Sequence, residues 1–365
     1  MNSTPSLNFD FQKNPKAIDD TKRENFLKNP GFGKIFTDHM LQIKYTNGTG
    51  WIDGKIIPYG PISLDPAVCL FHYGQEIFEG LKAYKTQDGH ITLFRPLANA
   101  KRFYNSALRM AMAPLPEAIF LKAVEEFVKV EKNWVPDSSV GSLYLRPFMI
   151  SSTPYLGVKP SPDYIFMIIA SPAGAYFSKD NEGVSVWVSE FYTRAASGGT
   201  GEAKCGGNYA ASLIAQQEAT KNNCDQIVFL DAAEHQWIEE MGGMNIFFVF
   251  DDGSLLTPPL SGTILPGITR DSILTLARDK GIKVREERYS VHQWIEDIKS
   301  GKIREVFACG TAAVVTPIGQ VKSSRGEFNI NGGKPGTLTQ EIRKALVDIQ
   351  YRRSADPYHW VHKVI

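Results

Sequence analysis

Two kinds of hydrophobic periodicity run through the chain, and together they predict both strands and helices. Short apolar or alternating runs with strand character occur at 36–45, 50–58, 143–150, 164–170, 184–191, 226–230, 236–240, 244–250, 255–258 and within 305–320. Apolar residues at spacings of three and four predict helices over 95–112, 117–133, 209–222, 269–280, 291–299 and 337–353. The mixture predicts an α/β (mixed α+β) protein.

Clusters of Pro, Gly and polar residues interrupt the periodic pattern and predict where one domain ends and the next begins. The stretch Ser171–Gly174, followed by the polar residues 178–183, is the best candidate for a boundary. The polar N-terminus is typical of a loosely packed extension. We therefore expect a flexible arm over 1–30, a small α/β domain over 31–177, a linker over 178–183 and a larger domain over 184–365.

Composition removes several classes of function. The 365 residues carry 40 Lys+Arg and 39 Asp+Glu, a net charge of +1, which argues against a surface that binds mainly nucleic acid or anionic lipid. No uninterrupted apolar stretch approaches the roughly 20 residues of a membrane-spanning helix. The four cysteines show no zinc-binding spacing, so we expect no metal site, free thiols and a cytoplasmic location.

The most unusual segment is RAASGGTGEAKCGGN, residues 194–208, in which glycines flank Lys204 on both sides. A lysine in such a loop is usually a solvated surface residue. A lysine that acts as a nucleophile needs a desolvated pocket or a neighbouring cation, and Arg194 could supply the positive charge. Lys204 is therefore our candidate catalytic residue.

Other segments supply the chemistry that such a lysine would need. Leu265–Arg270 opens a predicted helix whose free N–H groups, with the Thr269 hydroxyl, would bind an anion, and 310–313 forms a second small-residue turn. Glu240 ends a strand before Met-Gly-Gly and could pair with a cation. Each could instead be an ordinary cap, turn or exposed carboxylate. Together, an amine, a phosphate cradle and a carboxylate for a ring nitrogen are what pyridoxal phosphate requires.

At this point the sequence resembles the branched-chain amino-acid aminotransferases, pyridoxal-phosphate enzymes of fold type IV. The resemblance extends from about Phe32 to the C-terminus. It rests on seven blocks in order: FTDHM, FHYGQEIFEGLKAY, LFRP, YLRPF, KCGGNYAAS, EEMGGMN and LTPPLSGTILPGITR. It implies two domains with the cofactor in the cleft between them, and a homodimer.

The resemblance also implies roles for individual residues around the cofactor. Lys204 would form the internal aldimine and move the proton, Glu240 would pair with the pyridine nitrogen, and Tyr209 would bind the phenolic oxygen of the ring. The remaining residues that match the family's cofactor site are Arg95, Arg194, Leu265, Ile268, Thr269 and Thr311.

Substrate residues follow from the same resemblance. An aromatic wall would surround the aliphatic side chain, with Arg146 accepting the second carboxylate of glutamate and the Thr311-Ala312 turn holding the α-carboxylate. The aromatic wall would consist of Phe32, Phe78, Tyr144 and Tyr176. Tyr73, Leu156 and Val158 match residues that reach the neighbouring subunit's site. An arginine at the rim spares the aliphatic substrates the cost of a lone buried charge.

The expected reaction is ping-pong transamination of leucine, isoleucine and valine with 2-oxoglutarate. The alternatives are another fold type IV enzyme, namely a D-amino-acid aminotransferase or an aminodeoxychorismate lyase, or a catalytically silent cofactor-binding protein. The chain departs from the mammalian pattern in having Ala313 and Thr316 in place of a CxxC redox pair and Gly243 in place of a threonine. Bacterial-type membership is favoured.

Overall fold

The computed structural model describes residues 7–174 and 183–365, and these residues form two compact units. The first unit contains the described residues up to 174, Ala203–Gly206 and Asp348–Ile365. The second contains 183–202 and Gly207–Val347. The predicted mixed α/β class is confirmed. Ala203–Gly206 and Asp348–Ile365 belong to the first unit although they follow the first unit's other residues in the sequence.

The first unit is built on a nine-stranded sheet with the order β1-β3-β2-β8-β7-β5-β6-β18, to which β4 adds by pairing with β7. Its strands are β1 (Asp10–Phe11), β2 (His39–Thr46), β3 (Gly50–Pro58), β4 (Glu76–Phe78), β5 (Leu81–Lys85), β6 (Ile91–Phe94), β7 (Ser142–Ser151), β8 (Tyr164–Ala173) and β18 (Val361–Lys363). Its helices are α1 (Asp20–Lys28), α2 (Cys69–Tyr73), α3 (Pro96–Arg109) and α4 (Glu117–Val130), followed by a 3-10 turn, η1 (Lys132–Trp134).

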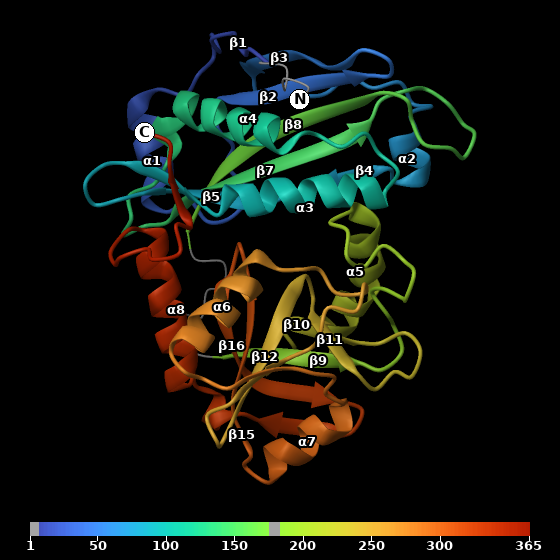
Figure 1. Ribbon diagram of the computed structural model, residues 1–365, viewed down its shortest axis with the longest axis vertical. Helices are drawn as coiled ribbons and strands as arrows, with labels where there is room; N and C mark the ends of the chain where they lie inside the picture. Colours follow the sequence, from blue (N-terminus) through green and yellow to red (C-terminus); the bar gives the residue numbers. More distant parts are fainter. Residues whose placement is uncertain (1–6, 175–182) are drawn as a thin grey trace. The chain divides into compact units, whose positions relative to one another are not determined.

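One face of this sheet is covered by α3 and α4 (Figure 1). The covering helices present buried apolar residues such as Phe103 and Phe120, which pack against Phe166 of β8. Side chains of successive strand residues point to opposite faces. In β7, Leu143 and Leu145 therefore join the core, while Tyr144, Arg146 and Phe148 lie on the other, half-buried face.

Two expectations about the first unit need correction. The strand predicted over 164–170 extends to Ala173, because Ser171–Ala173 also pair with β7. Pro172 is tolerated there because β2 pairs with β8 only as far as Ile168, so the missing N–H breaks no bond on that side. Part of the expected flexible arm is also regular: β1 pairs with β3, α1 follows, and Leu7 and Phe9 pack against the core.

The second unit also contains a nine-stranded sheet, and six of its strands close into a ring. The ring runs β11-β10-β9-β16-β15-β12 and is completed by pairing of β11 with β12 across Gly242-Gly243. The strands of this unit are β9 (Val184–Ser189), β10 (Gln226–Leu230), β11 (Ile238–Met241), β12 (Met244–Phe250), β13 (Leu255–Thr257), β14 (Val284–Glu286), β15 (Ile303–Gly310), β16 (Val314–Ser323) and β17 (Gly326–Asn329). Its helical segments are α5 (Gly206–Lys221), α6 (Ile268–Asp279), α7 (Val291–Lys299), α8 (Thr337–Gln350) and the 3-10 turn η2 (Asn331–Gly333), although the first residue of α5 and the last turn of α8 from Asp348 belong to the first unit.

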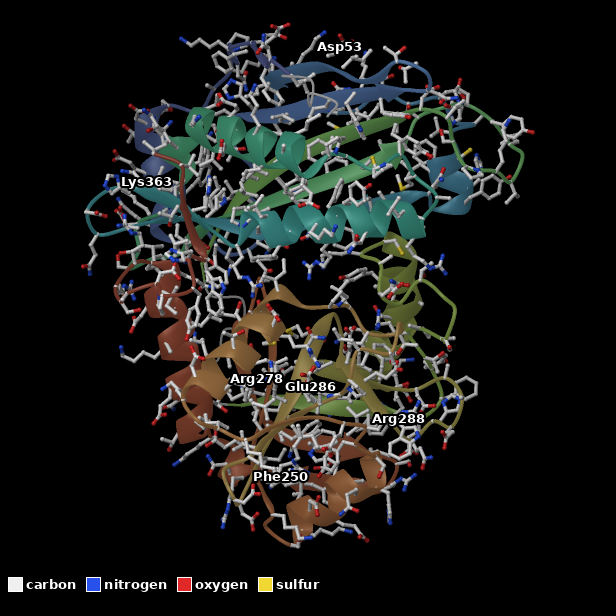
Figure 2. The ribbon with its side chains drawn as sticks, in the orientation of Figure 1. Asp53, Phe250, Arg278, Glu286, Arg288 and Lys363 are labelled. Atoms are coloured by element: carbon white, nitrogen blue, oxygen red, sulfur yellow. The ribbon has the colours of Figure 1, made fainter. Side chains whose placement is uncertain are left out.

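Helix α6 is fixed to this sheet by a charged network behind its first turn. The buried Arg270 donates to the Pro258 carbonyl and to Glu286, each at 2.9 Å. Arg278, further along the helix, donates to the other oxygen of Glu286 at 2.7 Å, and Figure 2 shows these two labelled side chains close together. These hydrogen bonds hold α6 against β14 and against the segment at Pro258.

No helix in the two described ranges is both long and apolar enough to cross a membrane.

Candidate active site

Lys204 lies in a short segment that is fastened to the first unit by three hydrogen bonds. Its N–H donates to the Ser106 hydroxyl of α3 at 3.0 Å, and its carbonyl accepts from the Phe78 N–H at 2.9 Å. Two residues later, the Gly206 N–H donates to the Glu76 carboxylate. Ala203 and Cys205 are buried in the core on either side of the half-buried lysine. The backbone that carries Lys204 is thus held in one place.

The Lys204 amine lies beside an aromatic surface on the half-buried face of the first sheet. Its Nζ is 4.9 Å from the centroid of the Phe78 ring. The guanidinium carbon of Arg146 lies 4.8 Å from the same ring and 5.4 Å from the ring of Tyr144, whose hydroxyl accepts a hydrogen bond from Arg146 at 3.1 Å. Phe32 meets Tyr144 edge-on at 5.2 Å. The structure therefore brings these five residues, all expected from the sequence, to one face.

A buried ion pair behind this surface was not expected from the sequence. Glu79 is fully buried, and Arg102 of α3 donates to both of its oxygens, at 2.7 and 3.0 Å. Asn99 also donates to Glu79 at 2.8 Å. Burial raises the pKa of Glu79, but the charges of Arg102 and Lys204 and these hydrogen bonds outweigh it and hold the pKa below its usual value. Only its neighbours in space identify this carboxylate, because nothing in the local sequence does.

In the second unit, Glu240 contacts two of the other residues predicted to bind the cofactor, Arg194 and Leu265. Its side chain is buried and pairs with the buried Arg194 at 3.0 Å. Its other oxygen accepts from the Leu265 N–H at 2.8 Å and from the Asn245 amide at 3.3 Å. A buried carboxylate that is paired and hydrogen-bonded in this way is stabilised as the anion. The sequence predicted Glu240, Arg194 and Leu265 separately but not their contact, and it missed Asn245.

Glu239, the residue before Glu240 in β11, is also buried. Its carboxylate accepts from the Thr263 hydroxyl at 2.5 Å. Burial raises the pKa of Glu239, and the hydroxyl and the Arg194 charge partly oppose that rise. Adjacent residues of a strand point to opposite sides. The two carboxylates therefore have different partners, and Glu240 has Arg194 within ion-pair distance.

The predicted anion cradle lies at the start of α6. The helix begins at Ile268, one residue before the predicted start at Thr269, and follows Gly267, which has no side chain to cap the first N–H groups. Thr269, in the first turn, is buried. Thr311 and Ala312 lie in the turn between β15 and β16, shortly before Val314, whose φ of 61° is rare for a β-branched residue. Such backbone strain is concentrated at functional sites, which supports a role for this turn.

Arg95 shows the same kind of strain in the first unit. It has a φ of 49° at the start of α3, and its N–H donates to the Trp360 carbonyl at 2.7 Å. Its guanidinium carbon lies 5.1 Å from the Trp360 ring. No pattern in the sequence predicts that the segment around Trp360 packs against Arg95.

The remaining residues predicted for the site lie on the surface, in the first turn of α5 or outside the described residues. Tyr73, Leu156 and Val158 are exposed, and the Tyr73 hydroxyl donates to the Leu156 carbonyl. Tyr209 lies in the first turn of α5, with its ring near Gly243. Tyr176, and the linker residues 178–182, lie outside the described residues. The four cysteines are buried and free, and among the described residues no group of three or more His, Cys, Asp or Glu side chains could hold a metal ion.

Comparison with known proteins gives a consistent result. The sequence model of the family described as amino-transferase class IV matches residues 76–321. The branched-chain-amino-acid aminotransferase of Mycolicibacterium smegmatis is 52% identical over 368 aligned positions, covering 100% of both chains.

Solved structures agree with this. The branched-chain amino acid aminotransferase of Escherichia coli has a TM-score of 0.74 at 28% identity, covering 88% of this chain and 99% of its own. The T.th. enzyme of the same name has a TM-score of 0.73 at 29% identity, covering 88% and 98%, and has been solved with N-(5'-phosphopyridoxyl)-L-glutamate. It has also been solved with 4-methylvaleric acid. The fold is the one expected for type IV, and the chain belongs to the class IV aminotransferase family and, within it, to the branched-chain-amino-acid aminotransferases.

Proposed function

We propose that this enzyme transfers the amino group of L-leucine, L-isoleucine or L-valine to 2-oxoglutarate, giving the branched-chain 2-oxo acid and L-glutamate. The observation that carries the proposal is that Arg146 and Lys204 both lie within 5 Å of the centroid of the Phe78 ring, and that Arg146 also lies against the ring of Tyr144. This surface is aromatic enough for an aliphatic side chain and has one cation for a second carboxylate. The T.th. relative binds ligands of both kinds.

Three features of the structure fit pyridoxal phosphate as the cofactor. Lys204 provides an amine on a fixed backbone. Glu240 is held as an anion by Arg194 and Leu265, which suits it to pair with a protonated pyridine nitrogen. The first turn of α6, with Thr269 and Ile268, and the turn at Thr311 present N–H groups for a phosphate. We assign Arg95 and Tyr209 to the same cofactor, Arg95 at the phosphate and Tyr209 at the phenolic oxygen.

When bound, pyridoxal phosphate supplies an aldehyde that condenses with amines and a ring that withdraws electrons from the substrate's α-carbon. The protein's own contribution is positioning and proton transfer. The Nζ of Lys204 takes the α-proton as a base and returns it as an acid, so the lysine must be close, oriented and able to lose its charge. Glu240 keeps the ring nitrogen protonated by offering it a fixed negative partner.

Recognition of two unlike substrates follows from the surroundings of Arg146. Burying an unpaired cation next to an aliphatic side chain would be costly. Here aromatic faces cover the guanidinium, and the Tyr144 hydroxyl satisfies part of it. Cation–π contacts of this kind contribute about 0.5–2 kcal/mol. The cation is thus tolerated when leucine is bound and available when glutamate is bound. The Thr311-Ala312 turn would hold the α-carboxylate in both cases.

A direct assay separates this function from its relatives. Purified enzyme with 2-oxoglutarate should convert L-leucine, L-isoleucine and L-valine, with at most a trace of activity on D-alanine. Turnover of D-alanine at a rate comparable to that of L-leucine would instead identify a D-amino-acid aminotransferase. Cofactor binding without turnover of any amino acid would identify a silent binding protein.

We also propose that the enzyme acts as a homodimer. Tyr73, Leu156 and Val158 are exposed apolar or aromatic residues held together in the first unit, where Tyr73 bonds to Leu156. Exposed apolar surface of this kind is typical of a protein interface. Light scattering of the active enzyme should give the mass of two chains. A fully active monomer would refute this assembly.

Gly243 offers a test of the Tyr209 assignment. An ideal Cβ at Gly243 would lie 3.0 Å from Cε1 of Tyr209, so a threonine there must displace the ring. We expect Gly243→Thr to fold and to bind pyridoxal phosphate about tenfold more weakly, the lower end of the 1–3 kcal/mol typical of overpacking. The affinity for pyridoxal phosphate is measured from the change in absorbance as the cofactor dissociates. Gly60→Thr, at a position with nothing within 4 Å of an added Cβ, should behave as the wild type. Unchanged cofactor affinity in Gly243→Thr would contradict a role for Tyr209.

A further inference from the structure

Glu76 is a half-buried carboxylate that the proposed reaction does not use, yet it contacts the segment that carries Lys204 and is influenced by the charge of Arg146. It belongs to β4, two residues before Phe78, and alternation places both side chains on the same face. Its carboxylate accepts the N–H of Gly206, two residues after Lys204. In the pairing of β4 with β7, Glu76 lies opposite Ile150 and Phe78 opposite Phe148, and the guanidinium carbon of Arg146 lies 4.8 Å from the centroid of the Phe78 ring.

The contact with Gly206 is built into the backbone. A Cβ at Gly206 would collide with Oε1 of Glu76, so only glycine lets the carboxylate approach this closely. Gly206 is also the first residue of α5, where N–H groups lack partners within the helix. Glu76 therefore caps this helix from a different element and fixes the end of the Lys204 segment.

The electrostatic contact is with Arg146. Burial raises the pKa of Glu76, and the Gly206 N–H and the charge of Arg146 oppose that rise. Across the two ranges that the structure describes, the Arg146 guanidinium has Tyr144 as its hydrogen-bond partner, and its Nε is buried without one. Glu76 is thus a carboxylate whose field reaches Arg146 without forming a close ion pair.

We propose that Glu76 is a positioning residue with a second role in specificity: it fixes the Lys204 segment and partly offsets the charge of Arg146, so that the site does not hold dicarboxylic substrates too tightly relative to aliphatic ones. This deepens the proposed function and rests on it. A fully uncompensated Arg146 would bind 2-oxoglutarate and glutamate more tightly, so that these dicarboxylates would compete better with leucine for the site. A close ion pair would remove the cation that the dicarboxylates need.

Glu76→Gln and Glu76→Ala separate the two roles. Glutamine keeps an oxygen for the Gly206 N–H and removes the charge, whereas alanine removes both. Calorimetry on the holoenzyme should show that Glu76→Gln binds glutarate about threefold to tenfold more tightly than the wild type does. The affinity of the variant for 4-methylvalerate should differ from that of the wild type by less than a factor of about two. The KM for 2-oxoglutarate should fall with kcat nearly unchanged. Glu76→Ala should show the same gain for glutarate but lose kcat with both amino donors.

Asp53→Asn is the matched control, because it removes the same charge from an exposed residue of the first unit, labelled in Figure 2. It should leave the affinities for glutarate and for 4-methylvalerate unchanged. The inference would be overturned if Glu76→Gln changed the affinities for glutarate and 4-methylvalerate by the same factor. It would also be overturned if Glu76→Gln lost as much kcat as Glu76→Ala. If wild-type enzyme failed to transaminate leucine, the proposed function would fail instead. The ligand affinities would still report on Glu76, since they require no turnover.

Discussion

Alanine in place of Lys204 is expected to abolish transamination while leaving a folded protein. The lost group is the amine that takes and returns the proton, and loss of a positioned acid–base group lowers rates on the order of 10²–10⁴-fold. The fold should survive because the contacts that hold this segment are backbone hydrogen bonds to Ser106 and Phe78, and the neighbouring Ala203 and Cys205 fill the core. Steady-state rates with L-leucine and 2-oxoglutarate provide the measurement.

Two further readouts make the Lys204 result specific. The variant should bind pyridoxal phosphate without the visible absorption that a lysine–aldehyde bond produces, and its thermal unfolding should match that of the wild type. Lys280→Ala, at an exposed position after α6, should keep full activity. Turnover by Lys204→Ala within a factor of two of the wild-type rate would mean that another group performs the proton transfer.

The second large effect is expected on stability, from Arg102→Met. This change leaves the fully buried carboxylate of Glu79 without its two-point partner. Breaking one side of a buried ion pair typically costs about 3–5 kcal/mol, because the remaining charge stays away from water. We expect the free energy of unfolding to fall by this amount, and urea titration of the variant and the wild type measures it. The rate should also fall, because Glu79 adjoins Phe78, whose N–H bonds to the Lys204 carbonyl.

The double variant Glu79→Gln/Arg102→Met is the control for this interpretation. When both charges are removed, no uncompensated ion remains, so most of the lost stability should return. Equal destabilisation in the single and double variants would show that the cost comes from lost packing and not from the buried charge.

Regular elements with strong periodicity could be predicted closely. The strands Gly50–Pro58 and Met244–Phe250 and the helix Val291–Lys299 have the predicted bounds, because a buried face imposes its spacing on the sequence. The short strands β4 and β18 were missed. They are held by pairing with β7 and β6 rather than by a pattern of their own. The end of β8 was predicted at Ala170 and lies at Ala173, because Pro172 interrupts the sequence pattern even where the sheet tolerates a proline.

The candidate site was predictable as a set of residue types but not as a set of contacts. Lys204, Glu240 and the α6 N-terminus stand in recognisable local surroundings, and the resemblance to a family supplied the aromatic residues. The Arg194–Glu240 pair and the Glu79–Arg102 pair join residues far apart in the chain. No local pattern encodes such pairs, since each depends on the fold that brings its members together. The same holds for Glu76, whose contact with Gly206 follows from the folded structure.

The closed ring of strands in the second unit imposes an order on synthesis. β9 is an early strand of this unit, yet it pairs with both β10 and β16. As the chain emerges from the ribosome, β10, β11 and β12 can form hairpins around Glu240, but one edge of β9 stays open until β16 has been made. Pairings between distant segments form slowly, and open edges invite association with other chains. The step that protects a newly made molecule from aggregation is therefore the arrival of β16, long after every group that holds Glu240 has been synthesised.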